Sequence, residues 1–236
     1  MVKIKEGDWI ELDFIGRVKR TGQIFDLTKE DVAKKEGIYQ EQQEYKPLKV
    51  RIGSQQLLNG LDKAMIGKEV GKSFKVIIKP EEAFGRRNPK LIQLTSLAKL
   101  KKKGVNPVPG MPLNIDGAMA YVRAVSGGRV ILDFNHPLSG KELEYEVYPI
   151  RLIEKTEEKV KSIASLLLNL EDRDYDIKVT GEELELKFKK DVPKNIQELF
   201  KKQLINQISE IKKVNIVSKS RESKKTQKEE DKSKKK

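Results

Sequence analysis

Residues 49–85 read KVRIGSQQLLNGLDKAMIGKEVGKSFKVIIKPEEAFG, and the spacing of their apolar residues changes twice. Apolar and polar residues alternate over 50–52, apolar residues recur at helical spacing over 57–65, and alternation returns over 74–78. A period of two is typical of a half-buried strand, and a period near 3.6 is typical of a helix. The stretch therefore predicts a strand, a short apolar helix and a second strand.

The same alternation occurs on both sides of this stretch, in residues 8–18, 22–27 and 142–150. A Thr-Gly pair between the first two runs indicates a turn. A short polar helix after the second run is predicted to be capped by Thr28, and the apolar helix by Ser54. Several antiparallel strands around one short helix predict an α+β fold, organised as a half-open barrel.

A basic segment, residues 86–135, interrupts the strand pattern, which resumes after it. It contains the run NPVPGMPLN and two predicted hairpins, one around an Asp-Gly pair and one around Ser-Gly-Gly. We therefore predict a small β-rich domain inserted into a first domain that comprises residues 1–85 and 136–155.

The rest of the chain has a different pattern. Residues 156–217 combine two amphipathic helical segments with a hairpin that turns at Gly181 and a final apolar strand, KVNIV. This combination predicts a separate C-terminal α/β domain. Residues 218–236 contain no apolar residue, which predicts a disordered basic tail.

Composition excludes several kinds of protein chemistry. The sequence has no cysteine and a single histidine, His136, which excludes disulfides and thiolate chemistry and argues against a zinc site. No apolar run approaches the ~20 residues that span a bilayer, and the N-terminus lacks the apolar block of a signal peptide. We therefore expect a cytoplasmic protein with no membrane segment and no metal.

The net charge of +13 is concentrated in two segments. Residues 86–135 hold nine Lys and Arg against two Asp, and residues 218–236 hold nine against four Asp and Glu. Basic segments bind phosphate groups in a salt-dependent way that is largely independent of sequence. One hypothesis is therefore a protein that binds nucleic acid or the ribosome. Against it, only Tyr121 and Phe134 are available in the insert for stacking on bases.

The order of these pieces resembles the FKBP family of peptidyl-prolyl cis-trans isomerases. The resemblance rests on a Gly-x-x-x-Leu-Leu-x-Gly element at 53–60, a Val-Gly turn at 70–71 and an Ala-Phe-Gly loop at 83–85. The insertion after that loop returns through Asn-His-Pro-Leu-x-Gly at 135–140, which is similar to the SlyD-type branch with its insert-in-flap chaperone domain. The C-terminal segment resembles that of the longer archaeal members.

The resemblance implies a fold, an activity and a site. It implies an FKBP half-barrel, an antiparallel sheet around a short helix, that rotates X-Pro bonds in unfolded or partly folded polypeptides without a cofactor. The implied site is an apolar pocket for the proline ring, with main-chain N–H groups near the helix start as donors to the substrate carbonyl. Its implied residues are Phe14, Phe25, Asp26, Leu48, Leu57, Leu58, Leu61, Phe84 and Tyr145.

Three of these positions depart from the family pattern. Phe14 replaces a strand tyrosine whose hydroxyl commonly pairs with the aspartate, here Asp26. Phe84 replaces a flap tyrosine whose hydroxyl often binds the substrate carbonyl, and Leu61 replaces the common tryptophan floor. We therefore predict an active but weaker isomerase on short peptides.

Each interpretation has a plainer alternative. The apolar pocket residues would be ordinary core in most proteins. The insert is either a module that captures client chains or a structural appendage, and residues 156–217 either form a homodimer or pack against the barrel. His136 has no partner for a nucleophilic or metal site. We predict that it orders the return from the insert by ring packing or a backbone hydrogen bond.

Overall fold

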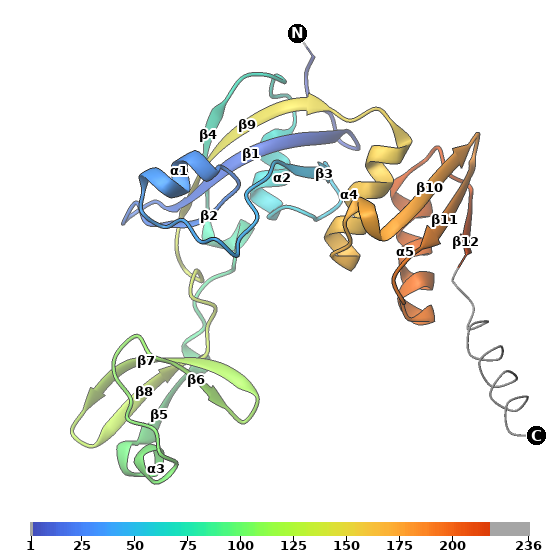
Figure 1. The fold of residues 1–236 in the computed structure, drawn as a ribbon. Coiled ribbons are helices and arrows are strands. Elements are labelled where there is room, and N and C mark those ends of the chain that lie inside the picture. The colour runs from blue at the N-terminus through green and yellow to red at the C-terminus, as the bar shows by residue number, and fades with distance from the viewer. Residues whose placement is uncertain (1, 218–236) are drawn as a thin grey trace, which may run out of the picture.

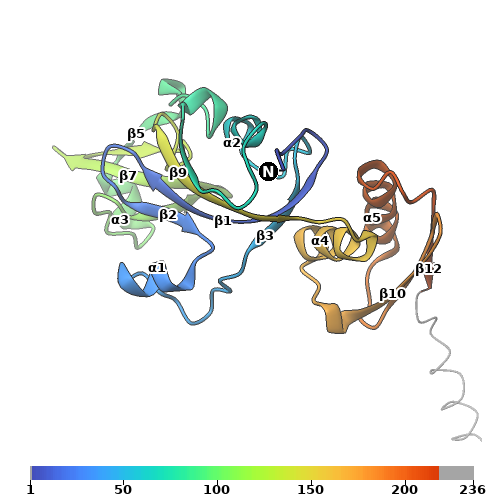
Figure 2. The same ribbon diagram turned by 90° about the horizontal axis from the view of Figure 1, so that it is seen from above.

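The computed structural model describes residues 2–217, in which the strands form three sheets (Figures 1 and 2). The first sheet is antiparallel and five-stranded, and β3 pairs with β1 beside the path of the other four strands. Its strands, in spatial order, are β2 (Ile24–Leu27), β1 (Trp9–Val18), β9 (Leu143–Leu152) and β4 (Phe74–Ile78), with β3 (Leu48–Arg51).

Helix α2 (Asn59–Met65) packs against this sheet and closes its core. Leu61 and Met65 are buried on the helix face that meets the strands. The helix lies very close to β4, because a Cβ atom on Gly60 would lie 2.5 Å from Cγ2 of Ile78. The predicted order of strand, apolar helix and strand, inside an α+β half-barrel, is confirmed.

Both predicted helix caps are wrong. Neither α1 (Glu30–Lys35) nor α2 has a side chain that caps its N-terminus by a hydrogen bond. The Thr28 hydroxyl instead accepts from the Phe14 main-chain N–H at 2.9 Å, so it joins the end of β2 to β1. The Ser54 hydroxyl donates to the main-chain carbonyl of the last residue of β3 at 2.6 Å. The Thr28 hydroxyl thus joins two strands, whereas the Ser54 hydroxyl stabilises the turn that follows β3.

The strands of the second sheet lie between β4 and β9 in the chain. Two connecting segments join this sheet to the first sheet (Figure 1). Helix α3 (Leu97–Lys102) covers one face, where Leu100 packs against the sheet. Both predicted hairpins are present, whereas β5 and α3 were not predicted. In spatial order the strands are β5 (Ile92–Ser96), β8 (Arg129–Asp133), β7 (Ala118–Ser126) and β6 (Pro112–Ile115). Short 3₁₀ turns, η1 (Pro80–Glu82) and η2 (Pro89–Leu91), precede β5.

The third sheet belongs to the C-terminal part of the chain. Strands β10 (Tyr175–Thr180) and β11 (Glu183–Phe188) form the predicted hairpin, and β12 (Lys213–Val217) runs parallel to β11. Helices α4 (Thr156–Leu168) and α5 (Lys194–Gln207) cover one face of the sheet, and the turn η3 (Asp172–Asp174) leads into β10. The tail prediction for residues 218–236 lies outside the described residues.

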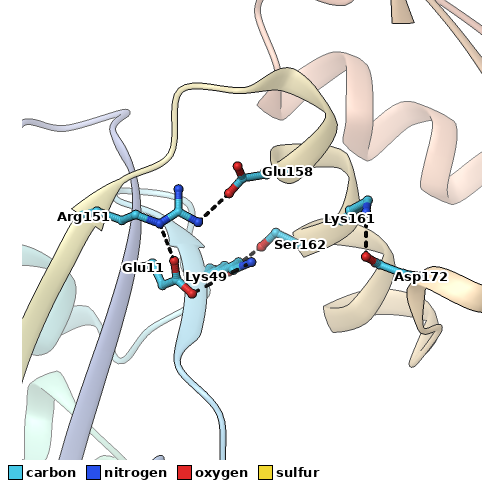
Figure 3. Close-up of polar contacts among 7 residues, drawn as sticks. All are labelled: Glu11, Lys49, Arg151, Glu158, Lys161, Ser162 and Asp172. Atoms are coloured by element: carbon cyan, nitrogen blue, oxygen red, sulfur yellow. Dashed lines mark hydrogen bonds and ion pairs between the residues drawn. The ribbon is translucent and has the colours of Figure 1, made fainter. Parts of the chain in front are cut away.

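The C-terminal part packs against the first sheet. Trp9 of β1 and Ile153, just after β9, are 5% and 3% exposed and belong to the C-terminal apolar core. Arg151 bridges Glu11 of β1 at 2.7 Å and Glu158 of α4 at 2.6 Å (Figure 3). Packing against the barrel, one of the two arrangements considered from sequence, is therefore present. Within residues 2–217, no helix has the length and apolar character to span a membrane.

Candidate active site

The predicted pocket residues come together around β1, β2, β9 and α2. Eight of the nine belong to one apolar cluster inside the first sheet, and only Asp26 does not. Three are buried, and the rest are half-buried at its edge. The buried ones are Phe14, Leu61 and Tyr145, and the half-buried ones are Phe25, Leu48, Leu57, Leu58 and Phe84.

Tyr145 is the centre of the aromatic part of this site. Its ring centroid lies 5.7 Å from that of Phe14 and 5.7 Å from that of Phe25, the second pair being nearly edge-on at 82°. Gly16 is opposite Tyr145 in the β1–β9 register, and a Cβ atom there would lie 2.8 Å from Cζ of Phe25. Only glycine leaves room for this packing. Sequence reasoning missed Gly16, although a glycine within a strand is a signal of close approach.

Asp26 supplies the charged edge of the site. Its side chain is exposed, yet the surrounding protein displaces enough water to raise the pKa of its carboxyl, with a smaller opposing effect from the Leu27 main-chain N–H. Within residues 2–217, no side chain donates a hydrogen bond to Asp26, as expected when Phe14 lacks a hydroxyl. Burial, and secondarily the charge of Asp26, raises the pKa of the Tyr145 hydroxyl.

The chain at the start of α2 has a main-chain N–H without a main-chain acceptor among the described residues. Leu58 precedes the helix, and within residues 2–217 its N–H donates to no other main-chain group. The loop before it is fixed from both sides: the Gly53 N–H donates to the buried carboxylate of Asp62 at 2.9 Å, and the Arg51 N–H donates to the Gln56 side chain at 2.8 Å. A substrate carbonyl beside Leu58 could therefore accept a hydrogen bond from the Leu58 main-chain N–H.

The flap residue Phe84 is held by the segment that returns from the second sheet. Its ring stacks on His136 at 4.3 Å with an interplanar angle of 6°, and its carbonyl accepts from the Ser139 hydroxyl at 2.9 Å. Nδ1 of His136 in turn accepts from the Leu138 main-chain N–H at 3.2 Å. Both contacts considered for His136, ring packing and a backbone hydrogen bond, are present, and its stacking partner is a predicted pocket residue.

Comparison with known proteins places this arrangement in a family. The family model described as FKBP-type peptidyl-prolyl cis-trans isomerase matches residues 2–101. A short-type peptidyl-prolyl cis-trans isomerase of Methanocaldococcus jannaschii is 37% identical over 144 residues, which cover 61% of this chain and 90% of that protein. The chain belongs to the FKBP-type peptidyl-prolyl cis-trans isomerases. Its substrates are accordingly proline-containing polypeptides.

Other relatives of this FKBP-type isomerase agree. The SlyD isomerase of Haemophilus influenzae is 33% identical over 119 residues, 48% of this chain and 62% of that protein. An FKBP-type 16 kDa isomerase of Escherichia coli is 30% identical over 106 residues, 43% of this chain and 71% of that protein. A second family model, described as FKBP26, IF domain, matches residues 93–138.

A groove of about 580 Å³ opens along one side of the candidate site. Of the nine predicted residues, Phe14, Asp26 and Leu48 line it, and the other six do not. Its far wall is formed by α4 and the chain after it, including Ser165 and Leu166. Nothing in the local sequence pattern of α4 indicates this position, because the helix follows Leu48 by more than a hundred residues.

Proposed function

We propose that the nine predicted residues form the pocket in which this FKBP rotates X-Pro bonds. The prolyl amide resists rotation because resonance gives its C–N bond partial double-bond character, with a barrier of ~18–20 kcal/mol. Resonance is lost when the amide is twisted, so the twisted group is less dipolar than the planar one. An apolar site that excludes water therefore binds the twisted amide better than the planar one, and no proton has to move.

This proposal rests on the set of aromatic and leucine side chains around Tyr145. It rests also on the Leu58 main-chain N–H, which has no main-chain acceptor within residues 2–217. The aromatic rings supply apolar contact to the proline ring. The N–H positions the substrate main chain by donating to a carbonyl. Asp26 supplies the polar edge. Each factor of ten in rate requires about 1.4 kcal/mol of preferential binding of the twisted form.

The pocket is tested with a proline tetrapeptide. Phe25→Ala removes a half-buried wall and should lower kcat/KM by about 10- to 100-fold, equivalent to ~1.4–2.8 kcal/mol. Ile77→Ala, on the outer face of β4 where Ile77 is 48% exposed, is the matched control and should change kcat/KM less than about twofold. A folded Phe25→Ala variant with wild-type kcat/KM would show that the pocket is elsewhere.

We further propose that the inserted sheet, within residues 86–135, captures unfolded client chains for the isomerase domain, residues 1–85 and 136–155. Helix α3 covers the face of this sheet that points away from the first sheet (Figure 1). On the other face, Leu94 and Met119 are 61% and 55% exposed. Exposed apolar side chains on one face of a sheet suit non-specific binding of apolar segments. Capture next to the pocket raises the effective concentration of client prolines.

Deletion of residues 88–134 tests this division of labour. Refolding of a proline-limited protein should slow at least about tenfold, whereas tetrapeptide turnover should change less than about twofold, since only long chains benefit from capture. The double variant Leu94→Asp with Met119→Asp should reproduce the refolding loss without deleting the sheet. Val108→Asp, at a site 59% exposed outside the strands, is the control. An equal loss in both assays would reject capture by the insert.

We also propose that residues 156–217 form a homodimer. The C-terminal part already packs on the first sheet, and it still exposes Leu167, Leu199 and Ile205 by 48%, 52% and 38%. Exposed large apolar groups on two helices are typical of an interaction surface. Light scattering should give the mass of a dimer for the full chain and of a monomer after truncation at Lys155. Two monomeric masses would contradict the proposal.

Contact with RNA or the ribosome is a second candidate role, as an accessory to isomerisation. It is favoured by the end of α3, where Lys99, Lys101 and Lys102 make no ion pair within residues 2–217. Binding through such a patch should weaken steeply with salt. A salt titration of RNA binding by the full chain and by the 88–134 deletion would separate this role from client capture.

A further inference from the structure

The groove beside the isomerase pocket joins two parts of the molecule. Pro47 and Leu48 form its near wall, and Ser165 and Leu166 of α4 form its far wall. Leu166 is 43% exposed, so an apolar side chain borders open space directly next to the pocket. Pockets of about 300–1,000 Å³ are large enough to enclose a drug-sized ligand. A volume of about 580 Å³ therefore accommodates a short segment of polypeptide.

The far wall is fixed in place. The Ser162 hydroxyl of α4 donates to the main-chain carbonyl of Lys49, one residue after Leu48 (Figure 3). Arg151 holds the start of α4 through Glu158, and Trp9 of β1 is buried in the C-terminal core. The groove thus has two walls whose separation is set by packing and hydrogen bonds, and a pre-organised groove binds an extended chain with a smaller loss of entropy than a mobile one does.

The charges around the groove favour a polypeptide over a phosphate-containing ligand. Every lysine that lines it has an acidic partner: Lys46 pairs with Glu44 at 2.7 Å, Lys49 with Glu11 at 3.9 Å and Lys161 with Asp172 at 2.6 Å. Asp26 and Glu171 add further negative charge to the lining. Phosphate groups require cations that are free to pair with them. A largely neutral peptide with apolar side chains can bind in the groove without free cations.

We infer that α4 extends the substrate site, so that the polypeptide on one side of the proline lies in the groove against Leu166 and Ser165. The inference rests on the proposed pocket, because Phe14, Asp26 and Leu48 belong to both the pocket and the groove. A chain that places its proline against Phe14 and continues past Leu48 enters the groove directly. The C-terminal part of the chain is thereby a determinant of substrate specificity, in addition to any role in assembly.

Three peptides test the inference: a proline tetrapeptide and two ten-residue peptides that extend it with uncharged, leucine-containing sequence on the N-terminal or the C-terminal side. In wild type, one of the two extensions should raise kcat/KM by about tenfold, since additional contacts contribute about 1.4 kcal/mol for each factor of ten. Leu166→Ala should reduce that gain by about 3- to 10-fold, the effect of losing part of a leucine contact. Its tetrapeptide kcat/KM should stay at the wild-type value.

The neighbouring leucine provides a matched control. Leu167 is 48% exposed on the same helix but does not line the groove, so Leu167→Ala should keep the full gain. No gain from either extension, or an equal loss in Leu166→Ala and Leu167→Ala, would overturn the inference. Failure of the proposed pocket would give a different result, namely unchanged tetrapeptide turnover in Phe25→Ala, so the two failures can be told apart.

Discussion

Asp26 costs stability at neutral pH in its present surroundings. Its folded-state pKa is raised by desolvation, so the native protein binds this proton more readily than the unfolded chain does. Stability therefore falls as pH rises from the ordinary value of 3.8 through the folded-state pKa, and the deficit persists above it. Because the Asp26 carboxylate lowers folding stability, its place at the edge of an apolar site is better explained by a role in substrate binding than by a role in stabilising the fold.

Asp26→Asn removes this titration. We expect the variant to be more stable than wild type at pH 7, and the difference to disappear once the pH is below 3.8, where both states of the wild type are protonated. Denaturant unfolding across a pH series measures the difference. Tetrapeptide kcat/KM should fall about 3- to 10-fold, since a charged edge of the site is lost. If Asp26→Asn is more stable than wild type by the same amount in acid as at pH 7, the gain does not come from ionisation of Asp26.

His136 is a positioning residue for Phe84, because the two rings stack face to face at 4.3 Å. His136→Ala leaves Phe84 without its support and should lower tetrapeptide kcat/KM by about 3- to 10-fold, about the effect of one aromatic pair. His136→Phe keeps a ring of similar shape and should restore most of the activity. If both variants lose activity equally, the imidazole nitrogens matter and the stacking does not.

At the scale of elements, the connection between the first and second sheets depends on one buried side chain. The Asn135 amide accepts from the Asn88 N–H at 2.8 Å and donates to the Asn88 carbonyl at 3.0 Å, so it pairs the two connecting segments like a rung of a sheet. It also donates to Asp133 at 2.7 Å, and Asp133 forms an ion pair with Arg87. The position of the insert relative to the first sheet therefore depends on this network.

Asn135→Ala should loosen the connection without changing the pocket. Each lost hydrogen bond costs about 0.5–1.5 kcal/mol, so exchange of the Asn88 amide proton should accelerate by about 10- to 100-fold in native-state hydrogen exchange. Asn114→Ala removes an amide that accepts from Gly117 within a hairpin turn, and it is the control, expected to leave Asn88 unchanged. Equal exchange of Asn88 in wild type and Asn135→Ala would contradict the network.

Helices and strands were predictable from sequence where the spacing of nearby apolar residues determines them. Alternation predicted the strands of the first sheet, and the Gly-x-x-x-Leu-Leu-x-Gly element placed α2 and the two leucines that precede it. The Thr28 hydroxyl was misassigned as a cap because its partner lies on β1, which a local reading does not bring near. The Ser54 hydroxyl was misassigned because α2 begins only at Asn59, too far along the chain for Ser54 to cap it. Helix α3 was missed because six residues give too short a pattern to separate from the strands around it.

At the scale of the whole molecule, what sequence did not predict is the contact between the first sheet and α4. The alternation in β1 places Trp9 on the same face as Glu11 and Asp13, opposite the apolar face of the strand, and so gives no sign that Trp9 is buried. Trp9 enters the C-terminal core, and this docking turns α4 into a wall of the substrate groove. Contacts between distant segments depend on shape and on pairs such as Ser162 with Lys49, which are 113 residues apart and which no short window of sequence contains.

Truncation after Lys155 tests this coupling through the only tryptophan in the chain. Removing the C-terminal part uncovers Trp9 and Ile153, so tryptophan fluorescence should shift to the red. The remaining domain should lose about 3–6 kcal/mol of unfolding free energy, the burial of two large apolar side chains. The 88–134 deletion is the control, because the insert does not contribute to the core around Trp9. A truncated protein with wild-type emission would mean that Trp9 is covered by the first sheet itself. In that case the far wall of the groove would not be held by the packing of Trp9 in the C-terminal core.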